Sequence, residues 1–411
     1  MRYKTESIQF SFENNAGETL SGRLEKPKTE VRAYALFAHC FTCTKNISAA
    51  TRISRKLSEL GIAVLRFDFT GLGNSDGDFA NTNFSSNVED LICAYQALEK
   101  SFEAPKILIG HSFGGAAVLK ASTLIDDVKA VVSIAAPSDT SHVAHLFKKN
   151  INEINSEGEA CVLLEGREFL IKKQFIDDLN ENDLLNGLKD SKKSYLIMHS
   201  PFDNIVSIDH AGNIFKSLKH PKSFISLDNI DHLVSKKEDA DYIGEQINAW
   251  AKRYLDTNEV SHNEPKLEGD TQILVESRDG KLFTNSIYSK NHFLIADEPE
   301  SVKGDDLGMS PYELLLSSLG ACTSMTMGMY ARRKGFNLKS VKVELSHKKD
   351  HFEDCKTCDD GPKKLDHIIK KISIDGDLSK EQKEKIYNIA EKCPVNRTLM
   401  SEIIIDSKLM D

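Results

Sequence analysis

The sequence predicts two domains of different fold class. Residues 1–256 are expected to form an α/β domain with a mostly parallel sheet and helices on both faces, because short apolar runs alternate there with amphipathic segments. Residues 270–411 are expected to form an α+β domain, because strand-like runs are separated by two helical segments. Residues 257–269 have no apolar period and are the expected linker.

Composition and charge argue against several classes of protein. A chain of 411 residues is too long for one ordinary domain. Its 53 basic and 62 acidic residues give a net charge of −9, which argues against nucleic acid or an anionic membrane as the main partner. No apolar run approaches the roughly 18 residues of a membrane-spanning helix, and the N-terminus lacks the apolar core of a signal peptide. The eight cysteines have no regular dense spacing, so we expect a cytoplasmic protein rather than a secreted disulfide framework.

Short apolar runs rich in Val, Ile, Leu and Phe predict the buried strands of the first domain. They are residues 33–39, 62–69, 106–112, 129–137, 194–200 and 222–228. Amphipathic segments between them, such as residues 48–60 and 87–102, predict the helices. Residues 138–190 interrupt the alternation with a polar, helix-like block, which is typical of a small cap over an active site.

The second domain has its own order of elements. Strands are predicted at residues 271–280, 281–289, 292–299, 340–348, 367–376 and 401–406, with helices at 310–335 and 379–392.

A G-x-S-x-G pattern marks the first candidate site. Gly110, Ser112 and Gly114 directly follow a predicted strand and open a predicted helix. In that context the glycines permit a sharp turn that exposes the serine hydroxyl above the helix N-terminus. The pattern alone has a high false-positive rate, so the interpretation depends on partners elsewhere in the chain. We expect His111 to be a structural neighbour of this turn.

Two such partners follow in the expected order. A serine becomes a nucleophile when a histidine takes its proton and a carboxylate fixes the histidine, and after such a turn the acid precedes the histidine in the chain. Asp203 and His232 each come just after a predicted strand, at the strand ends where active sites of parallel sheets gather. We therefore expect Ser112, Asp203 and His232 to be catalytic, with Asp231 and His210 as alternatives for the acid and the histidine.

Backbone amides must also stabilise the oxyanion of the reaction. We expect the amides of Phe113, which follows the serine, and of Phe41, in the loop after the strand at 33–39. Cys40 and Cys43 flank Phe41 as a C-x-x-C pair. Loop packing near the mouth of the site is the favoured interpretation of this pair, with a redox or metal role as the alternatives.

These features make residues 1–256 similar to the α/β-hydrolase family. The resemblance covers the alternating pattern, the GHSFGG segment and both triad partners. It implies hydrolysis of an ester, a thioester or a related acyl bond. It does not define the substrate, because one fold supports many activities.

Cys322 is the second candidate nucleophile. It lies in an apolar helical run, about three turns from the predicted helix start, where the positive end of the helix dipole contributes little. Arg332 and Arg333 lie roughly 15 Å further along the same helix, too far to pair with it. Arg278 and Arg397 are the other candidate activators. Taken alone, the run favours a buried core cysteine.

Cys393 changes this interpretation. It is expected to close the last helix, with Pro394 stopping it, so that the thiol lies at a helix end rather than in the core. A peroxide-reducing cysteine becomes a sulfenic acid and needs a second thiol nearby, which Cys393 would supply. Glu313, at the start of the helix that carries Cys322, is expected to form a capping box with Ser310.

Residues 270–411 resemble the OsmC and organic hydroperoxide resistance (Ohr) family. Two segments carry the resemblance, SPYELLLSSLGACTSMT and CPVNRTL. The resemblance implies a dimeric thiol peroxidase for organic hydroperoxides, with Cys322 peroxidatic, Cys393 resolving and Glu313 part of an Arg–Glu pair at the pocket. Family members place an activating arginine shortly before the helix, and residues 300–309 contain none.

The whole chain thus resembles the bifunctional α/β-hydrolase/OsmC-like proteins of bacteria. We expect an esterase or thioesterase in the N-terminal domain and a thiol peroxidase in the C-terminal domain. The alternative is an OsmC-like domain that serves only for dimerisation or binding. The expected partners are acyl ester and organic hydroperoxide substrates, a thiol reductant and a second copy of the chain. No bound cofactor is expected.

A group of metal-ligand residues remains open. His347, His351, Cys355 and Cys358 have the donor types of a tetrahedral zinc site, but their spacing matches no standard finger. A zinc site and an accessory redox pair are alternatives to a solvated loop, which is favoured, so no metal site is expected.

Overall fold

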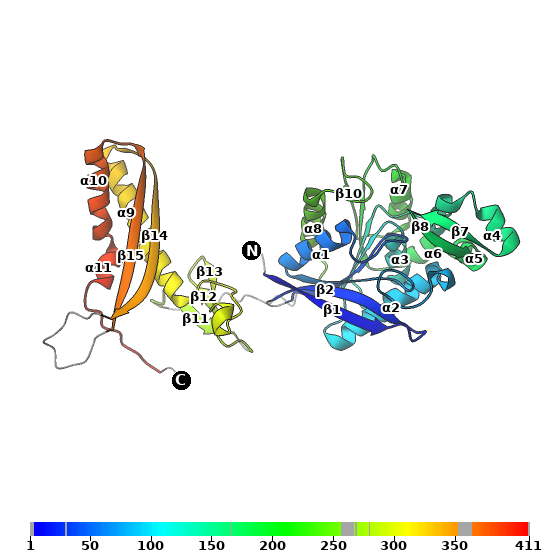
Figure 1. Ribbon diagram of the computed structural model, residues 1–411, viewed down its shortest axis with the longest axis horizontal. Coiled ribbons are helices and arrows are strands. Elements are labelled where there is room, and N and C mark those ends of the chain that lie inside the picture. Colours follow the sequence, from blue (N-terminus) through cyan, green and yellow to red (C-terminus); the bar gives the residue numbers. More distant parts are fainter. Residues whose placement is uncertain are drawn as a thin grey trace. The chain divides into compact units, whose positions relative to one another are not determined.

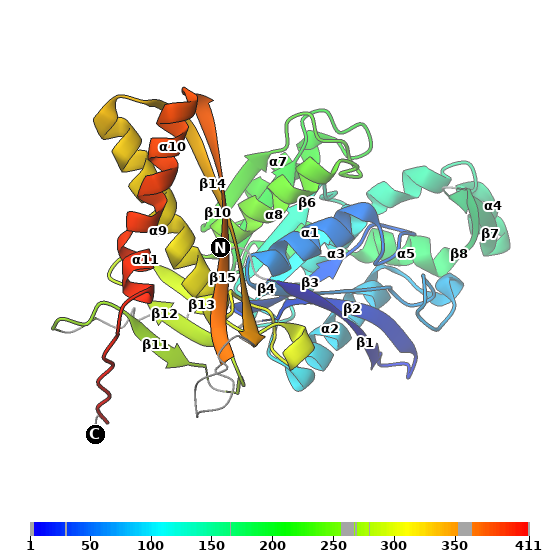
Figure 2. The ribbon, with the colours of Figure 1, turned by 60° about the vertical axis from the view of Figure 1, so that its left-hand side comes forward.

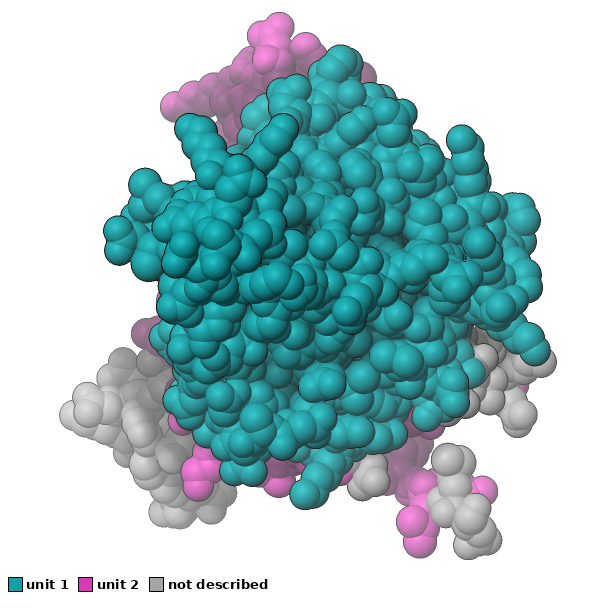
Figure 3. All heavy atoms as spheres, turned by 90° about the vertical axis from the view of Figure 1, so that its right-hand side faces the viewer, with its two compact units in different colours: residues 1–262 teal, residues 263–411 magenta. Residues whose placement is uncertain are grey.

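The computed structural model divides the chain into two compact units, residues 1–262 and residues 263–411, which are coloured separately in Figure 3. The structure describes residues 4–28, 31–164, 166–255, 267, 269–278, 280–351 and 364–409, with the backbone alone for residues 349–351, 364 and 365. The linker expected at 257–269 lies almost wholly outside the described residues. Each unit is therefore described by itself.

The first unit is built on an eight-stranded sheet of order β1-β2-β4-β3-β5-β6-β9-β10 (Figure 1). The strands are β1 (Thr5–Glu13), β2 (Thr19–Pro27), β3 (Ala33–Ala38), β4 (Ile62–Phe67), β5 (Ile107–His111), β6 (Ala130–Ile134), β9 (Ser194–His199) and β10 (Lys222–Ser226). The six strands from β3 onward pair in parallel, as predicted, while β1 and β2 are antiparallel additions at one edge. Neither β1 nor β2 was among the predicted strands, and the side chains of β1 alternate in exposure as in an edge strand.

Helices cover both faces of this sheet, as predicted. α1 (Ser48–Glu59) and α8 (Lys237–Ala251) pack on one face and contribute to one apolar core. α2 (Phe84–Ser101), α3 (Phe113–Ala121) and α7 (Ile208–Ser217) pack on the other face and contribute to a second core. The carboxyl ends of the parallel strands therefore meet at one edge between two covered faces, where a site can form.

An insertion between β6 and β9 occupies the region expected to form the cap. Its elements are η2 (Thr140–Phe147), α4 (Ile151–Glu157), β7 (Glu159–Leu164), β8 (Arg167–Lys172), α5 (Lys173–Glu181) and α6 (Leu184–Leu188). The helix-like block contains the expected helical segments and, in addition, an unpredicted hairpin in which β7 and β8 pair antiparallel. Ala160, Val162 and Leu164 are buried at every second position of β7, a period-two pattern that predicts a strand.

The second unit combines a long two-stranded antiparallel sheet with three helices and a separate three-stranded sheet (Figure 2). The strands are β11 (Leu274–Ser277), β12 (Asn285–Tyr288), β13 (Phe293–Ala296), β14 (Asn337–His351) and β15 (Lys364–Asp377), and the helices are α9 (Pro311–Lys334), α10 (Lys380–Ile389) and α11 (Pro394–Leu399). Short 3-10 turns η3 (Glu300–Val302) and η4 (Ala390–Lys392) complete the unit. α9 packs on β14, and α10 and α11 pack on α9.

The prediction of a strand at residues 401–406 was wrong. Residues 402–409 have no regular structure, and the side chains of Ile403, Ile404 and Ile405 are 55%, 89% and 83% exposed. An isolated β-strand leaves its backbone groups without partners, and in the described part of this chain no strand pairs with this segment. The apolar sequence of the segment is consequently left facing solvent.

No helix among the described residues combines the length and the apolar character that a membrane crossing requires.

Candidate active site

Ser112 lies on the sharp turn between β5 and α3. Its backbone has φ 54° and ψ −123°, a left-handed conformation that L residues rarely adopt. The flanking glycines are required by space: a Cβ on Gly110 would lie 2.2 Å from the Gly114 carbonyl oxygen, and a Cβ on Gly114 would lie 2.3 Å from the His39 carbonyl oxygen. The G-x-S-x-G pattern is therefore imposed by the close approach of three backbone segments.

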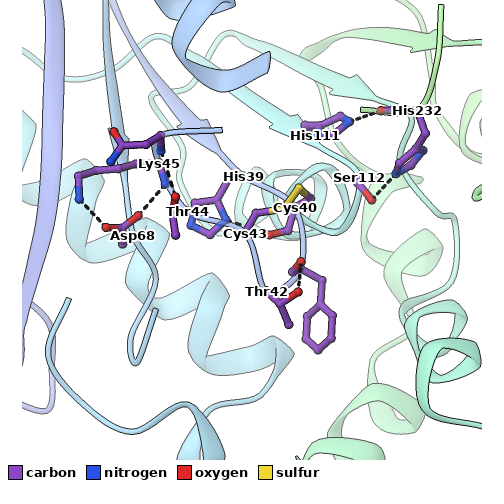
Figure 4. The surroundings of a disulfide bond; sticks show 12 residues. His39, Cys40, Thr42, Cys43, Thr44, Lys45, Asp68, His111, Ser112 and His232 are labelled. Carbon is purple, nitrogen blue, oxygen red and sulfur yellow. Dashed lines mark hydrogen bonds and ion pairs between the residues drawn. A yellow bond between two sulfur atoms is a disulfide. The ribbon is translucent and has the colours of Figure 1, made fainter. Parts of the chain in front are cut away.

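The structure brings Ser112, His232 and Asp203 together in one hydrogen-bonded chain. The Ser112 Oγ lies 3.0 Å from His232 Nε2, and His232 Nδ1 lies 2.7 Å from Asp203 Oδ2; Ser112 and His232 appear in Figure 4. The ionised carboxylate accepts the Nδ1 proton, which leaves Nε2 as the acceptor for the serine hydroxyl. This is the tautomer that a general base needs.

Asp203 is held as a carboxylate by its surroundings. Its Oδ1 accepts hydrogen bonds from the amides of Ile205 (2.8 Å) and Val206 (2.9 Å). Burial raises the pKa of Asp203, but the hydrogen bond with His232 and these amides outweigh burial and leave the pKa below its ordinary value. The acid therefore remains charged at neutral pH and can stabilise an imidazolium.

Asp231 and His210, the alternatives for the acid and the histidine, have other hydrogen-bond partners. Asp231 accepts hydrogen bonds from the amides of Leu233 and Ser235 and stabilises the turn after His232. His210 accepts from Ser138, and its ring packs against another histidine ring at 4.7 Å between centroids. Neither contacts Ser112.

Two further histidines position the loops of this site. His111 Nε2 lies 2.7 Å from the His232 carbonyl oxygen, and His199 Nε2 lies 2.8 Å from the Val206 carbonyl oxygen. Both rings are buried, and burial lowers the pKa of His111 to about 4 and lowers that of His199 as well, so both are neutral donors at neutral pH. His199 was not among the predicted site residues, although it ends a parallel strand as His111 does, and that position indicates such a role.

The loop expected to supply the second oxyanion donor is closed by a disulfide between Cys40 and Cys43 (Figure 4). The Cys43 amide also donates to the Cys40 carbonyl oxygen at 3.2 Å, so Phe41 and Thr42 form the middle of a closed turn. The ring of Phe41 packs edge-on against that of Phe113 at 5.4 Å. Packing alone, the favoured interpretation of the C-x-x-C pair, was incomplete because the two sulfurs are bonded.

A cavity of about 100 Å³ opens at Ser112 and His232. Phe41 and Phe113 form part of its wall, and Val143 and Leu146 contribute side chains from the insertion. The remaining wall is formed by Cys40, Cys43, Pro137, His142, His145, Ile205, Val206 and Leu233. The cavity is mostly apolar, with the Ser–His pair on one side.

In the second unit, α9 and α11 bring two cysteines together. Cys393 is buried, and its Sγ lies 3.6 Å from the Thr323 hydroxyl and 3.3 Å from the Asn396 amide nitrogen. Cys322, which precedes Thr323 on α9 and is partly exposed, is close enough to lower the pKa of the Cys393 thiol. Cys393 closes the predicted helix, as expected, because it is the C-cap of η4, which follows α10 directly. This helix is not the last one, since Cys393 is also the N-cap of α11, where Pro394 suits the first position. The expectation that the thiol lies outside the core was wrong, because Cys393 is buried.

The surroundings of Cys393 favour its thiolate. Burial raises the pKa of Cys393, but hydrogen bonds from Thr323, the Asn396 amide and Cys322, together with the charge of Lys370, leave the pKa below its ordinary value. Lys370 was not among the predicted site residues, because it lies on β15 and nothing in the sequence near it indicates an interaction with a distant cysteine.

The predicted Arg–Glu pair is not formed among the described residues of this chain. Glu313 closes the predicted capping box, in which its Oε2 accepts from the Ser310 amide at 2.8 Å. Arg278 donates to Ser286 on the three-stranded sheet, and Arg397 lies on α11.

The candidate metal cluster lies largely outside the described residues, because Cys355, Cys358 and the side chain of His351 are not described. His347 stacks on Tyr312 and hydrogen-bonds Asp366 at 2.8 Å. The described side chains include no group of three or more that could hold a metal ion.

Two family models match the chain, one in each unit. The model for "Serine aminopeptidase, S33" matches residues 29–157, and the model for "OsmC-like protein" matches residues 304–408.

Similar proteins agree with this division. The crystal structure of the esterase domain of a Rhodothermus marinus protein is 46% identical and has a TM-score of 0.51, covering 61% of this chain and 99% of that chain. The mouse alpha/beta hydrolase domain-containing protein 10 is 23% identical with a TM-score of 0.51, covering 60% and 99%, and indicates the fold alone.

Relatives identified by sequence match the first unit less closely. The mouse palmitoyl-protein thioesterase ABHD10, a mitochondrial protein, is 25% identical over 211 residues, which is 50% of this chain and 70% of that protein. Its human counterpart is 31% identical over 96 residues, which is 23% of this chain and 30% of that protein. Together with the fold and the Ser112 turn, these matches show that the chain belongs to the α/β-hydrolase/OsmC-like proteins, in which an α/β hydrolase precedes an OsmC-like domain.

Proposed function

We propose that the first unit hydrolyses acyl esters or thioesters by nucleophilic attack of Ser112. The supporting observation is the hydrogen-bonded chain from Ser112 Oγ through His232 to Asp203, at 3.0 and 2.7 Å. As Oγ attacks the carbonyl carbon, His232 Nε2 takes its proton and then gives it to the leaving alcohol or thiol. Asp203 stabilises the imidazolium formed in between. A water activated by His232 then hydrolyses the acyl-enzyme.

Two amides are proposed to bind the oxyanion of the tetrahedral intermediates. The Phe113 amide is the first of α3, where helix geometry leaves it without an intrahelical acceptor. The Phe41 amide is the second donor, within the turn closed by the Cys40–Cys43 disulfide. Donors fixed in advance at this point stabilise developing charge without reorganisation.

The size of the cavity favours short acyl groups. A mostly apolar space of about 100 Å³ accepts a small hydrocarbon chain but does not enclose a long one. The mouse relative is named a palmitoyl-protein thioesterase, so a long acyl chain is the competing substrate class.

Turnover of a chain-length series tests this proposal. p-Nitrophenyl acetate, butyrate, octanoate and palmitate would be compared, with acetyl and butyryl thioesters of one thiol as the matched series. We expect the highest kcat/KM for the short acyl groups and no turnover above background in Ser112→Ala. A kcat/KM that rises toward palmitate would reject the preference for short acyl groups but not the hydrolase proposal. No ester or thioester turnover by the folded wild type would contradict the hydrolase proposal.

For the second unit we propose a thiol peroxidase with Cys322 and Cys393 as its redox pair. The Cys322 thiolate attacks one peroxide oxygen, the alcohol leaves, and Cys322 becomes a sulfenic acid. Cys393 then displaces water and forms a disulfide, which a thiol reductant reduces. Cys322 is partly exposed and Cys393 is buried, so a hydroperoxide reaches Cys322 more readily. Because this cycle needs reduced thiols, the proposed compartment is the cytoplasm, for which the Cys40–Cys43 disulfide of the first unit is unusual.

Mass spectrometry after one equivalent of cumene hydroperoxide tests the pair. A Cys322–Cys393 disulfide is expected under non-reducing conditions, and dimedone should trap a sulfenic acid on Cys322 in Cys393→Ser. A trapped Cys393 in Cys322→Ser, with none in Cys393→Ser, would reverse the two roles. Two untouched thiols would favour the alternative, in which the OsmC-like domain is a non-catalytic binding or dimerisation module.

We also propose that the second unit forms a homodimer. The apolar core within this chain is small and centres on Met327, Ala331, Ile386 and Ala390. Met325 and Met329 lie on another face of α9 and are 67% and 73% exposed. The isoleucines at 403–405 are exposed as well. A second copy would cover these apolar side chains and pair the unpaired segment at 402–406 as a strand.

Sedimentation equilibrium tests the dimer. The wild-type chain is expected to sediment at twice the mass of 45.9 kDa, and Met325→Glu/Met329→Glu is expected to sediment as a monomer. Leu124→Glu, a 58% exposed leucine of the first unit, is the control and should leave the dimer intact. A monomeric wild type would contradict the proposal.

A further inference from the structure

A second cavity in the first unit, of about 330 Å³, is lined almost entirely by polar residues. Its cationic side chains are Arg23 on β2, Lys45 in the loop before α1, Arg55 on α1 and Arg66 on β4. We call it the arginine pocket. None of its lining residues lines the Ser112 cavity. In Figure 4, the loop that carries the Cys40–Cys43 disulfide has Cys40 on the side of Ser112, while Lys45 and its partner Asp68 lie away from Ser112.

The arginine pocket holds more positive than negative charge. Arg66 Nη2 lies 2.6 Å from Glu25 Oε1, and Arg55 Nε lies 3.8 Å from the same oxygen, so the two guanidinium groups share one carboxylate. Arg23 donates to the Ser7 hydroxyl at 3.2 Å and forms no ion pair with a described carboxylate. Lys45 is neutralised by Asp68. The three guanidinium groups of the pocket are therefore accompanied by a single buried carboxylate, that of Glu25, which pairs with two of them.

The neighbouring cations lower the pKa of Arg66. Burial lowers the pKa of Arg66, its bond to Glu25 raises it, and the charges of Arg55 and Arg23 lower it further. Both arginines are therefore close enough to Arg66 for their charges to act on it. A bound anion would relieve this repulsion.

Two buried side-chain atoms at the pocket have no hydrogen-bond partner among the described residues. They are the Nε of Arg66, a residue that is only 2% exposed, and the hydroxyl of Thr51. Helix α1 begins beside the pocket, between the lining residues Asn46 and Thr51, and its N-cap residue Ile47 provides no side-chain acceptor. A buried donor without a partner costs roughly 1–3 kcal/mol. Because both atoms are themselves inaccessible, a ligand in the pocket would meet the lining cationic side chains and the start of α1 instead.

We propose that the arginine pocket binds the phosphate group of an anionic ligand. A phosphate offers several acceptor oxygens and up to two negative charges, which matches forked guanidinium donors and the positive end of a helix. The shared chemistry is a phosphate, carried either by the free ion or by a phosphomonoester. The site is separate from the Ser112 cavity and does not depend on the proposed hydrolase activity.

Isothermal titration of the full-length protein with inorganic phosphate and with phenyl phosphate, at constant ionic strength, tests this proposal. Arg23→Gln and Arg55→Gln remove the two arginines that do not form the buried pair. Arg52→Gln is the matched control, because Arg52 lies on the same helix but donates to the Ser235 carbonyl oxygen and does not line the pocket. Thermal unfolding of each variant verifies that it is folded.

We expect saturable binding of one phosphate group per chain. Arg23→Gln and Arg55→Gln should each weaken it about tenfold or more, as the loss of a charge-assisted hydrogen bond predicts, while Arg52→Gln leaves it unchanged. Tighter binding of phenyl phosphate identifies a phosphomonoester as the ligand, and equal or tighter binding of inorganic phosphate identifies the free ion. No saturable binding of either probe, or an equal loss in Arg52→Gln, would overturn the proposal.

Discussion

The ring of His111 donates from Nε2 to the carbonyl oxygen of His232 at 2.7 Å. His111 is the last residue of β5 and immediately precedes Ser112, while His232 comes from the loop after β10. One hydrogen bond thus ties the backbone of the general base to the strand that carries the nucleophile. It holds His232 in position without contacting the reacting atoms.

Removing this bond is expected to slow the chemical step. His111→Ala should lower kcat about tenfold with little change in KM, because the imidazole of His232 loses its alignment with Ser112. His111→Gln, whose amide can donate to the same carbonyl oxygen, should recover most of the activity. Steady-state kinetics on p-nitrophenyl butyrate measures both. Equal activity of His111→Ala and the wild type would show that the bond does not position the base.

The same histidine is expected to make the first unit less stable in acid. Burial lowers the pKa of His111 from 6.5 to about 4 in the folded protein, so the unfolded state binds the extra proton between these values. The free energy of unfolding should therefore fall as the pH drops from about 6.5 to about 4. The single tryptophan, Trp250 on α8, reports this transition.

The comparison is with His111→Gln, which removes the titrating group. Its unfolding free energy should depend less steeply on pH in this window, although His39, whose pKa burial also lowers to about 4, leaves a residual slope. An unchanged slope in His111→Gln would contradict the pKa assignment.

The second glycine of the G-x-S-x-G turn is expected to be required for folding. A Cβ on Gly114 would lie 2.3 and 2.5 Å from two backbone oxygens, so Gly114→Ala should destabilise the first unit by about 3 kcal/mol. Gly212→Ala is the control, since a Cβ on Gly212 in α7 meets nothing within 4 Å; its stability should rise by up to about 1 kcal/mol. Urea unfolding followed by Trp250 fluorescence measures both, and equal stability of the two variants would refute the steric account.

The hydroxyl of Thr323 is expected to favour the thiolate of Cys393. Thr323→Val removes a hydrogen bond that lowers the pKa of Cys393, so this pKa should rise and the thiolate should form only at higher pH. Titration of thiolate absorbance at 240 nm follows the change. Thr326→Val is the control, because Thr326 donates to the Cys322 carbonyl oxygen instead. Equal titration curves for the two variants would exclude this role for Thr323.

The sequence predicted the parts of the fold and site that depend on local chemistry. Continuous apolar runs marked β3 to β6, and the glycines around Ser112 followed from a steric need of that turn. Asp203 and His232 were found because parallel strands end at a common edge. Their chain order added a second, independent indication.

The remaining features depend on contacts between distant segments. The contribution of Lys370 to the pKa of Cys393 joins β15 to the residue before α11, so it leaves no local pattern. The segment at 401–406 has a strand-like sequence but lacks a neighbour within the described part of the chain. Its conformation is therefore decided by what pairs with it.

Labelling with a fluorophosphonate probe, followed by peptide mass spectrometry, determines whether Ser112 is an activated nucleophile. We expect one labelled residue in the first unit, Ser112, with the label lost in Ser112→Ala and strongly reduced in His232→Ala, where the hydroxyl remains but its base is absent. A folded wild-type protein that takes up no label, or a label that persists in Ser112→Ala, would show that Ser112 is not the nucleophile.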